Sequence, residues 1–312
     1  MGLGTAQQTV TTAANFIPEL WSDEVIAGYK KNLVLGNCVT KINHSGKKGD
    51  TIHIPAPVRG SANSKAANTQ VTLQGDTHSV VNLSIDKHYE YSVVIEDITE
   101  VQALSSLRRF YTDDAGYALA TQVDNDLFIQ AEALNGGTAG ANTWVAGVIG
   151  GDGVTAYDPT ANTNTGNASD ITDAGIRKMI LQLDNVDVPM DSRCLVIPPI
   201  AANDMLGINR FTEQQYIGDG AAIKTGKIGS IYGIDVFVSS NCPVETAADT
   251  STTHRVGLML HKDAMALVEQ MGVRSQTQYK QEYLGDLFTS DTIYGVGELR
   301  NTSGVCFVVP ST

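Results

Sequence analysis

The sequence predicts an α+β protein in which a long helix joins a strand-rich part to a second, mixed part. Three observations support this fold class. Helical periodicity fills residues 97–134 without a proline, alternating strands fill residues 49–95 before it, and strands alternate with helices in residues 170–272 after it. The 312 residues are enough to bury a large core and to form two subdomains.

Residues 1–35 are predicted to form an arm followed by a short helix. Residues 1–15 carry no charge, which is typical of a segment that orders only against a partner. Pro18 then stands in the first turn of a helix that ends near Asn32 and has one apolar side. This order favours docking on a neighbouring chain, and packing on its own chain is the alternative.

Residues 36–95 are predicted to contain a long two-stranded excursion with flanking strands. Apolar and polar residues alternate at 49–57, where the excursion begins, and at 80–85 and 89–95, where the chain returns. Residues 59–70 between them hold no aliphatic side chain larger than alanine and indicate a polar tip. Because an isolated hairpin of this size is marginal in water, we expect it to lie on another subunit.

Residues 96–135 are predicted to hold one long helix. Asp97 and Glu100 have the spacing of a capping box, and Asn135 with the glycines after it indicates a left-handed stop. Such a helix is roughly 55 Å long, which exceeds a small domain, so it should act as a strut between parts. Gly116 leaves a break into two helices as an alternative, and a coiled-coil seam is a weaker one.

The C-terminal half is predicted to contain an exposed insertion, an α/β subdomain and returning strands. The insertion covers residues 136–169, which are rich in Gly, Thr and Asn. In residues 170–272 we expect a helix capped by Ser169, strands at 194–197, 234–238 and 256–260, and helices at 200–206 and 263–269. In residues 273–312 we expect a hairpin of strands 292–296 and 305–309 around a turn at 301–304.

Composition excludes several classes of function. The formal charge of −13 argues against a basic groove that binds nucleic acid, whereas a wall that repels phosphates would suit a container. The four cysteines, Cys38, Cys194, Cys242 and Cys306, have no metal-ligand spacing and are predicted to be buried free thiols. Neither a signal peptide nor a membrane anchor is expected, which places the chain in a reducing cytoplasm.

No motif predicts catalysis, a cofactor or a metal. The stretch from Gly220 to Lys227 resembles a phosphate loop, but its spacing is too long by one residue and Ile228 replaces the hydroxyl residue. The glycine cluster at 150–153 lacks the spaced acidic ligands of a calcium loop. The six histidines form no ligand cluster, and His53 and His88 fall in predicted strands as structural side chains.

The order of these segments resembles the major capsid protein of tailed bacteriophages, with the Hong Kong 97-like fold and more narrowly the podovirus type. Each motif is short, and their order along nearly the whole chain carries the resemblance. They are Phe16-Ile17-Pro18-Glu19-Leu20-Trp21 with Ala27-Gly28-Tyr29 behind the arm, Gly49-Asp50-Thr51-Ile52 entering the hairpin, and Thr292-Ile293-Tyr294-Gly295-Val296 near the end.

The resemblance implies a role for each segment. The arm would be the N-arm, the hairpin the E-loop that reaches over an adjacent subunit, the helix the spine of the P domain, and residues 170–272 the A domain. Residues 207–233 would then form an A-domain loop near the axis of the capsomer. Inter-subunit contacts are expected at Arg59, Ser61, Asn63, Lys65, Asn68 and Gln70 of the E-loop tip and at Phe16, Ile17 and Trp21 of the arm and helix. Gly116 becomes a candidate bend in the spine.

The resemblance also implies partners. The chain would assemble with itself into hexamers and pentamers of an icosahedral shell around double-stranded DNA, which it would not read by sequence. A scaffolding protein, a portal and a decoration protein are further expected partners, and no membrane or cofactor is expected. The shell would form in the cytoplasm of the host bacterium and persist as the virion capsid. The alternatives are an encapsulin-like compartment and a cytosolic α/β enzyme with a lid at residues 136–169.

Overall fold

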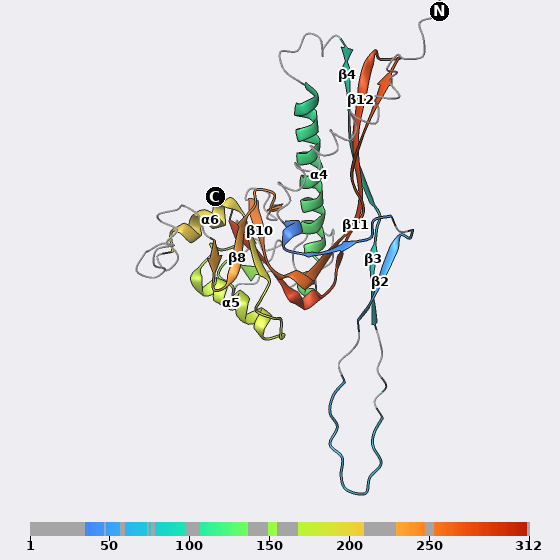
Figure 1. Ribbon diagram of the computed structural model, residues 1–312. Coiled ribbons are helices and arrows are strands. Elements are labelled where there is room, and N and C mark those ends of the chain that lie inside the picture. Colours follow the sequence, from blue (N-terminus) through green and yellow to red (C-terminus); the bar gives the residue numbers. More distant parts are fainter. Residues whose placement is uncertain are drawn as a thin grey trace, which may run out of the picture.

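Two β-sheets, one long helix and a protruding hairpin make up the protein (Figure 1). The computed structural model describes residues 35–46, 48–56, 60–73, 75, 79–97, 107–136, 149–154, 168–208, 229–246 and 253–310. The mixture of helices and sheets confirms the predicted α+β class.

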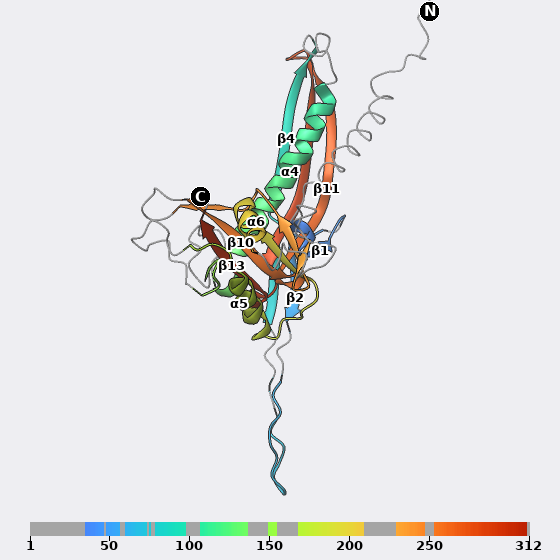
Figure 2. The same ribbon diagram turned by 90° about the vertical axis from the view of Figure 1, so that its left-hand side faces the viewer.

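A long sheet of four strands runs along one side of the molecule in the order β1-β11-β12-β4 (Figures 1 and 2). Its centre is an antiparallel hairpin of two long strands, β11 and β12, interrupted by register shifts near Met271. The short β1 pairs parallel to β11 at one edge, and β4 pairs antiparallel to β12 at the other. The bounds are Thr40–Asn43 for β1, Met265–Lys280 for β11, Gly285–Glu298 for β12 and Lys87–Glu96 for β4.

A second sheet forms a separate body beside the long sheet, with strand order β5-β13-β10-β6-β8-β7 and β9 paired to β10. Two helices, α5 and α6, pack on one of its faces through a shared apolar core that includes Ile176, Met205 and Phe307. The bounds are Ile149–Gly150 for β5, Asp173–Asp184 for α5, Arg193–Ile197 for β6, Pro199–Leu206 for α6, Ser230–Ile231 for β7, Ile234–Val238 for β8, Val244–Thr246 for β9, Thr253–His261 for β10 and Gly304–Pro310 for β13.

The predicted strut is helix α4, Leu107–Ala131, which contacts both sheets. Its buried side chains recur every four residues, at Ala115, Leu119, Val123, Leu127 and Ala131. The first two pack with Phe288 of the long sheet, whereas the last three join the core against the other face of the second sheet. The helix therefore holds the two sheets together, as Figure 2 shows.

The end of this helix differs slightly from the prediction. The α-helix ends at Ala131 and continues as a turn and a 3₁₀ helix, Leu134–Gly136. Asn135 has a φ of 59°, so the left-handed stop is confirmed. Residues 98–106 of the predicted helix lie outside the described part of the chain.

Three local predictions are wrong. Residues 263–269 are not a helix, because a 3₁₀ turn, Lys262–Ala264, leads directly into β11. The strands predicted as a terminal hairpin belong to different sheets, since β12 pairs with β11 and β4 while β13 pairs with β10 and β5. Helix α5 is capped by Thr172, whose side chain accepts a hydrogen bond from the Gly175 amide at 3.0 Å, and not by Ser169.

The glycine cluster at 150–153 has a packing role. Helix α5 approaches it so closely that a Cβ on Gly175 would lie inside contact distance of the Gly151 carbonyl, and a Cβ on Gly153 would meet Gly175 at 2.7 Å. These glycines allow the first turn of the helix to rest on the backbone beside β5. Gly153 also has a φ of +70°, which glycine adopts without strain.

The cysteines and two of the histidines occupy the predicted kind of environment. All four thiols are free; Cys38, Cys242 and Cys306 are buried, and Cys194 is half-buried. Burial raises the pKa of Cys242 and of Cys306 to about 12, so both stay protonated at neutral pH. His53 bonds to Asn82 across the β2–β3 pair at 2.6 Å, and His88 bonds to Asp291 across β4 and β12 at 3.1 Å.

Asp291 links the three main strands of the long sheet. Its carboxylate accepts two hydrogen bonds from Arg274 on β11, at 3.1 and 2.7 Å, and one from His88 on β4. Although burial alone would raise the pKa of Asp291, the bonds from Arg274 and His88 outweigh it and hold that pKa below its ordinary value. A carboxyl group with a depressed pKa stabilises the fold above its unfolded pKa of about 4, and this contribution is lost as the pH falls through the folded pKa.

We therefore expect Arg274→Gln to lower the free energy of unfolding at pH 7 but to change it much less at pH 2.5. Urea unfolding of both proteins at the two pH values measures the difference. The variant Asp291→Asn, which removes the titrating group itself, should likewise reduce the decrease in the free energy of unfolding between pH 7 and pH 2.5. An equal loss for Arg274→Gln at both pH values would show that this ion pair does not shape the acid stability.

Candidate inter-subunit interface

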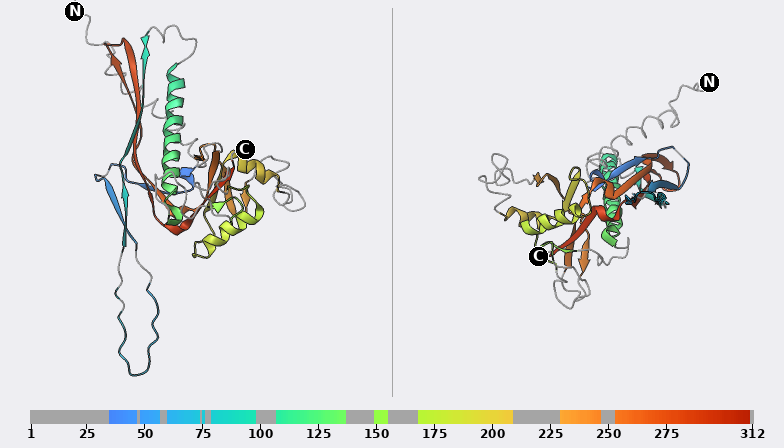
Figure 3. Two further views of the ribbon diagram at one scale, coloured as in Figure 1. Left: turned by 180° about the vertical axis from the view of Figure 1, so that it is seen from behind. Right: turned by 90° about the horizontal axis from the view of Figure 1, so that it is seen from below.

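The hairpin predicted as the E-loop consists of β2, Thr51–Ala56, and β3, Ser79–Ser84, in antiparallel register. Its base rests on β12 of the long sheet. Gly295 and Gly297 on β12 permit this contact, because a Cβ on Gly295 would lie inside contact distance of the Ser84 carbonyl oxygen and one on Gly297 would meet the Leu83 side chain. The hairpin is thus fixed at its base and points away from both sheets (Figures 1 and 3).

Beyond the paired strands, residues 60–73 form an extended loop at the far end of the hairpin (Figure 3). All of its residues are exposed. The loop contains a tight turn, in which the Thr69 hydroxyl donates a hydrogen bond to the Ala66 carbonyl at 2.7 Å and Asn68 has a φ of 62°. The structure places five predicted contact residues on this loop, namely Ser61, Asn63, Lys65, Asn68 and Gln70, and Arg59 lies outside the described residues.

Sequence reasoning missed the apolar part of the loop. Val71 is 61% exposed and Leu73 is 90% exposed, at the end of the loop that leads back toward β3. An aliphatic side chain with that exposure is unfavourable in a lone subunit, since its burial would contribute about 1.5–3 kcal/mol. The signal in the sequence was the alternation Val-Thr-Leu at the end of a polar segment.

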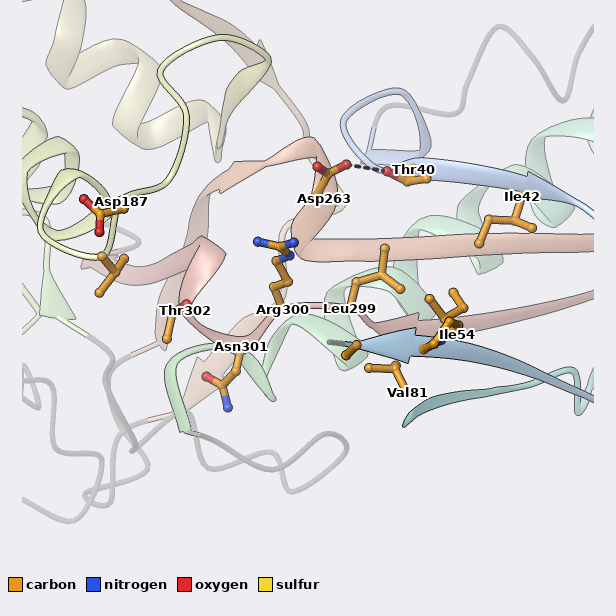
Figure 4. A pocket seen from close by; sticks show the side chains of 13 residues that line it. Thr40, Ile42, Ile54, Val81, Asp187, Asp263, Leu299, Arg300, Asn301 and Thr302 are labelled. Carbon is orange, nitrogen blue, oxygen red and sulfur yellow. Dashed lines mark hydrogen bonds between the residues drawn. The ribbon is translucent and has the colours of Figure 1, made fainter. Parts of the chain in front are cut away.

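An open pocket of about 810 Å³ lies at the base of the hairpin, and we name it the basal groove (Figure 4). One end is apolar and the other carries charges, as Figure 4 shows. Thr40 on one wall donates a hydrogen bond to Asp263 at 3.2 Å. The lining side chains are Thr40, Ile42, Ile54, Pro55, Ala56, Val81, Val186, Asp187, Asp263, Leu299, Arg300, Asn301 and Thr302.

The remaining predicted residues are those of the arm and of the spine helix. Phe16, Ile17 and Trp21 lie outside the described residues. Gly116 is buried near the middle of α4, where the α-helix runs without interruption through it. Its role as a bend in the spine stays a prediction.

Buried carboxylates on α4 fix the helix to its surroundings, and sequence reasoning missed them as well. Asp126 accepts a hydrogen bond from the Tyr294 hydroxyl at 2.7 Å and lies 3.7 Å from the Lys87 ammonium. Asp124 accepts from the Leu35 amide at 3.0 Å, at the start of a 3₁₀ helix, Leu35–Asn37. Both are at most 3% exposed, so each needs its partners, and together they tie α4 to β12 and to the segment that follows residue 34.

The described residues provide little support for a catalytic or metal-binding site. Among them, no group of three or more His, Cys, Asp or Glu side chains is arranged to hold a metal ion. The basal groove contains neither a histidine nor a cysteine. In the part of the chain that the structure covers, no helix has the length and apolar character needed to cross a membrane.

Comparison with solved structures shows the same fold in phage proteins. A chain from Mycobacterium phage Che8 has a TM-score of 0.66 at 23% identity, covering 88% of this chain and 90% of that one. The capsid structure of cyanophage P-SCSP1u has a TM-score of 0.66 at 20% identity, covering 90% and 89%. The mature capsid of bacteriophage PhiM1 has a TM-score of 0.63 at 13% identity, covering 89% and 86%. A comparison with curated protein sequences gave no match.

The family model described as phage capsid protein matches residues 90–298. This range is about two thirds of the chain and contains α4, both long strands and most of the second sheet. It also contains the Thr292 to Val296 segment on which the resemblance was based. The agreement of the family model with the fold of the solved structures confirms the resemblance, and the chain belongs to the phage capsid protein family.

Proposed function

We propose that the chain is the major capsid subunit of a tailed phage, many copies of which form hexamers and pentamers of an icosahedral shell around double-stranded DNA. The observation that carries this proposal is the exposed hairpin loop, residues 60–73, which projects away from the described sheets and helices of its own subunit (Figures 1 and 3). A two-stranded projection of this kind gains stability only when another surface covers it. A shell built from many identical copies supplies that surface.

The segments take the following roles in the proposal. Residues 1–35 are the N-arm, residues 36–95 the E-loop with its flanking strands, and residues 96–135 the spine of the P domain. Residues 136–169 are an insertion that either fills a gap or binds a decoration protein. Residues 170–272 are the A domain, and residues 273–312 return to both domains.

The charge of the chain suits a container for nucleic acid. A formal charge of −13 disfavours binding to phosphates, so packaged DNA would not adhere to the subunits. A scaffolding protein and a portal would take part in assembly within the host bacterial cytoplasm, and the completed shell would be the capsid of the virion. Membership of the phage capsid protein family supports a structural role in place of an enzymatic one.

Electron microscopy of the expressed protein, alone and with a scaffolding partner, tests the proposal. We expect closed shells of uniform size, and DNA recovered from particles purified out of infected cells. Closed shells that contain cargo proteins in place of DNA would favour an encapsulin-like compartment. Light scattering that shows only one or two chains per particle, with or without a scaffolding partner, would overturn the proposal and favour an enzyme.

The polar tip gives the first assembly prediction. Replacing residues 59–70 with a Gly/Ser linker of equal length should stop or strongly reduce shell formation, because the span is kept but the contacting side chains are lost. The monomer should keep its circular dichroism spectrum and its unfolding midpoint, since all described residues of this range are exposed. Normal closed shells from this variant would remove the E-loop role of the segment.

Gly116 gives a second prediction, which concerns the expansion of the shell. At an exposed site, alanine in place of glycine stabilises a straight helix by about 1 kcal/mol. Because Gly116 is buried, the added methyl group also has a packing cost. If the spine bends here, Gly116→Ala should allow compact shells to form but slow their expansion, as followed by sedimentation or microscopy. Unchanged assembly and unchanged expansion would remove the bend and leave α4 as a rigid strut.

A further inference from the structure

Two cysteines that are far apart in the sequence meet in the core between α4 and the second sheet. Cys38 lies between the 3₁₀ helix Leu35–Asn37 and β1, and Cys194 is the second residue of β6. Cys38 belongs to the buried apolar cluster that α4 shares with the second sheet, and Cys194 packs against the same cluster. The Cys38 thiol donates a hydrogen bond to the Cys194 sulfur.

The backbone holds these two segments next to each other. Side chains alternate along a strand, and Cys194 and Val196 both lie on the face of β6 that is turned toward α4. Lys262 connects this end of β6 to the start of β1, because its amide donates to the Ser192 carbonyl at 3.1 Å and its carbonyl accepts from the Thr40 hydroxyl at 3.1 Å. The approach of the two thiols is therefore fixed by the fold around them.

The two thiols differ in exposure and in acidity. Cys38 is 1% exposed, whereas Cys194 is the one cysteine of the four that is not fully buried. The hydrogen bond from Cys38 lowers the pKa of Cys194 below its ordinary value, against the effects of burial and of Asp235, and the Lys262 ammonium lowers it further. The same bond, together with burial, raises the pKa of Cys38. Cys194 is thus the thiol that ionises more readily and that a small solute reaches first.

We infer that Cys38 and Cys194 form a redox pair, which a peroxide converts to a disulfide that locks the long sheet to the second sheet. The Cys194 thiolate attacks one oxygen of the peroxide, the O–O bond breaks, hydroxide leaves, and Cys194 becomes a sulfenic acid. The Cys38 sulfur then attacks the sulfenic sulfur, so that the S–S bond forms, the S–O bond breaks, and the Cys38 proton leaves with the oxygen as water. Two thiols and one hydrogen peroxide give one disulfide and two waters.

The bond would have a structural consequence beside α4. It would join the segment that leads into β1, at the edge of the long sheet, to β6 of the second sheet, and it would close a loop of about half the chain. A cross-link that closes so long a loop restricts the unfolded chain strongly. A reducing cytoplasm would keep the pair open during assembly, and oxidants outside the cell would close it in the released particle. This timing rests on the proposed function, whereas the pairing of the two thiols does not.

Peptide mapping of the folded wild-type chain tests the pairing. The protein is treated with hydrogen peroxide, denatured in N-ethylmaleimide to block the remaining thiols, and digested with trypsin without a reductant. Cleavage places Cys38 in residues 32–41 and Cys194 in residues 194–210, each with a single cysteine. We expect these two peptides as one disulfide-linked species, with Cys242 and Cys306 alkylated. Cys194 oxidised to a sulfinic acid beside an alkylated Cys38, or four alkylated cysteines, would overturn the inference.

Single substitutions separate the roles of the two thiols. Cys38→Ser should leave the Cys194 sulfenic acid without its partner, so that peroxide drives it on to the sulfinic acid. Cys194→Ser should leave Cys38 reduced under the same treatment, because Cys38 is buried and holds its proton. Rapid oxidation of Cys38 in the Cys194→Ser variant would overturn the assignment of Cys194 as the thiol that reacts first.

Thermal unfolding measures whether the disulfide locks the structure. Peroxide-treated wild-type protein should unfold about 5 °C or more above the same protein kept in reductant. Cys242→Ala is the matched control, because Cys242 lies in the same buried cluster outside the pair, and it should keep this difference, whereas Cys38→Ser should lose it. Equal midpoints for the oxidised and reduced wild type would overturn the lock. Chains that form the linked peptides but assemble into no shell would overturn the proposed function and leave the redox pair intact.

Discussion

We expect Gly295→Ala to abolish shell assembly while leaving the second sheet folded. The Cβ of an alanine at this position would lie inside contact distance of the Ser84 carbonyl oxygen and 3.0 Å from the Ile85 Cα, both of which are backbone atoms. A backbone neighbour cannot rotate away as a side chain can, so the base of the hairpin must move off β12. The cost should be about 1–3 kcal/mol in the free energy of unfolding. We expect assembly to be lost mainly because the displaced hairpin no longer reaches the neighbouring subunit, and less because of the lower stability.

Two further glycines provide graded controls for this result. Gly297→Ala meets the flexible end of the Leu83 side chain, so it should destabilise less than Gly295→Ala. Gly229→Ala meets nothing within 4 Å and should behave as the wild type. Urea unfolding and electron microscopy of the three variants measure the two effects separately. Assembly by Gly295→Ala at the level of Gly229→Ala would contradict an anchoring role for this contact.

Much of the fold was predictable because the apolar residues within several segments recur with one clear period. The strands at 51–56, 79–84 and 87–96 follow alternating patterns, and α4 follows a run of apolar residues at helical spacing. Residues 263–269 were predicted wrongly because Ala, Met, Leu and Glu favour a helix over so short a window. In the structure β1 and β12 flank this segment, and pairing on both sides outweighs the local preference.

Strand pairing was the least predictable feature. The turn signal at 301–304 is real, because the structure has a 3₁₀ helix at Asn301–Ser303. The strands on either side nevertheless enter different sheets, and the partners of β13 lie at least 40 residues away in sequence, in β10 and β5. A local pattern can mark a strand and a turn, but it carries no information on which of several distant edges the strand will meet.

The candidate site was only half predictable for the same reason. The polar loop could be found because its composition differs from that of the flanking strands. The basal groove could not, because six separate segments build it, from Thr40 near the start of the described chain to Thr302 near its end. No spacing in the sequence relates these segments, and only the packing of β2 and β1 around the end of β12 brings them together.

The largest loss of stability is expected from Arg193→Met. Arg193 is 3% exposed, and its guanidinium donates to the Asp184 carboxylate at 2.6 Å, the Val188 carbonyl at 2.6 Å and the Pro189 carbonyl at 2.8 Å. Methionine fills similar volume but leaves all three acceptors without this donor. Because Asp184 is 31% exposed, water offsets part of the loss, and we expect a decrease of about 3 kcal/mol in the free energy of unfolding.

The control for this substitution lies on α5, the helix that ends at Asp184. Arg177 pairs with Asp173 at 3.1 Å across one turn of α5, but its side chain is 55% exposed, so Arg177→Met should cost at most about 0.5 kcal/mol. Urea unfolding of both variants gives the comparison. Equal losses for the two variants would show that the buried guanidinium contributes no more than a surface ion pair.

Arg193 also affects the basal groove, because the turn that it holds carries Val186 and Asp187, which line one wall. Arg193→Met should therefore weaken assembly even at temperatures where the subunit remains folded. Asp187→Asn separates the two effects, since the side chain is exposed and asparagine also tolerates the left-handed φ of 58° at this position, so the free energy of unfolding should stay nearly unchanged. If Asp187→Asn raises the concentration needed for assembly and Arg193→Met raises it further, the buried guanidinium acts on assembly by positioning the wall of the groove.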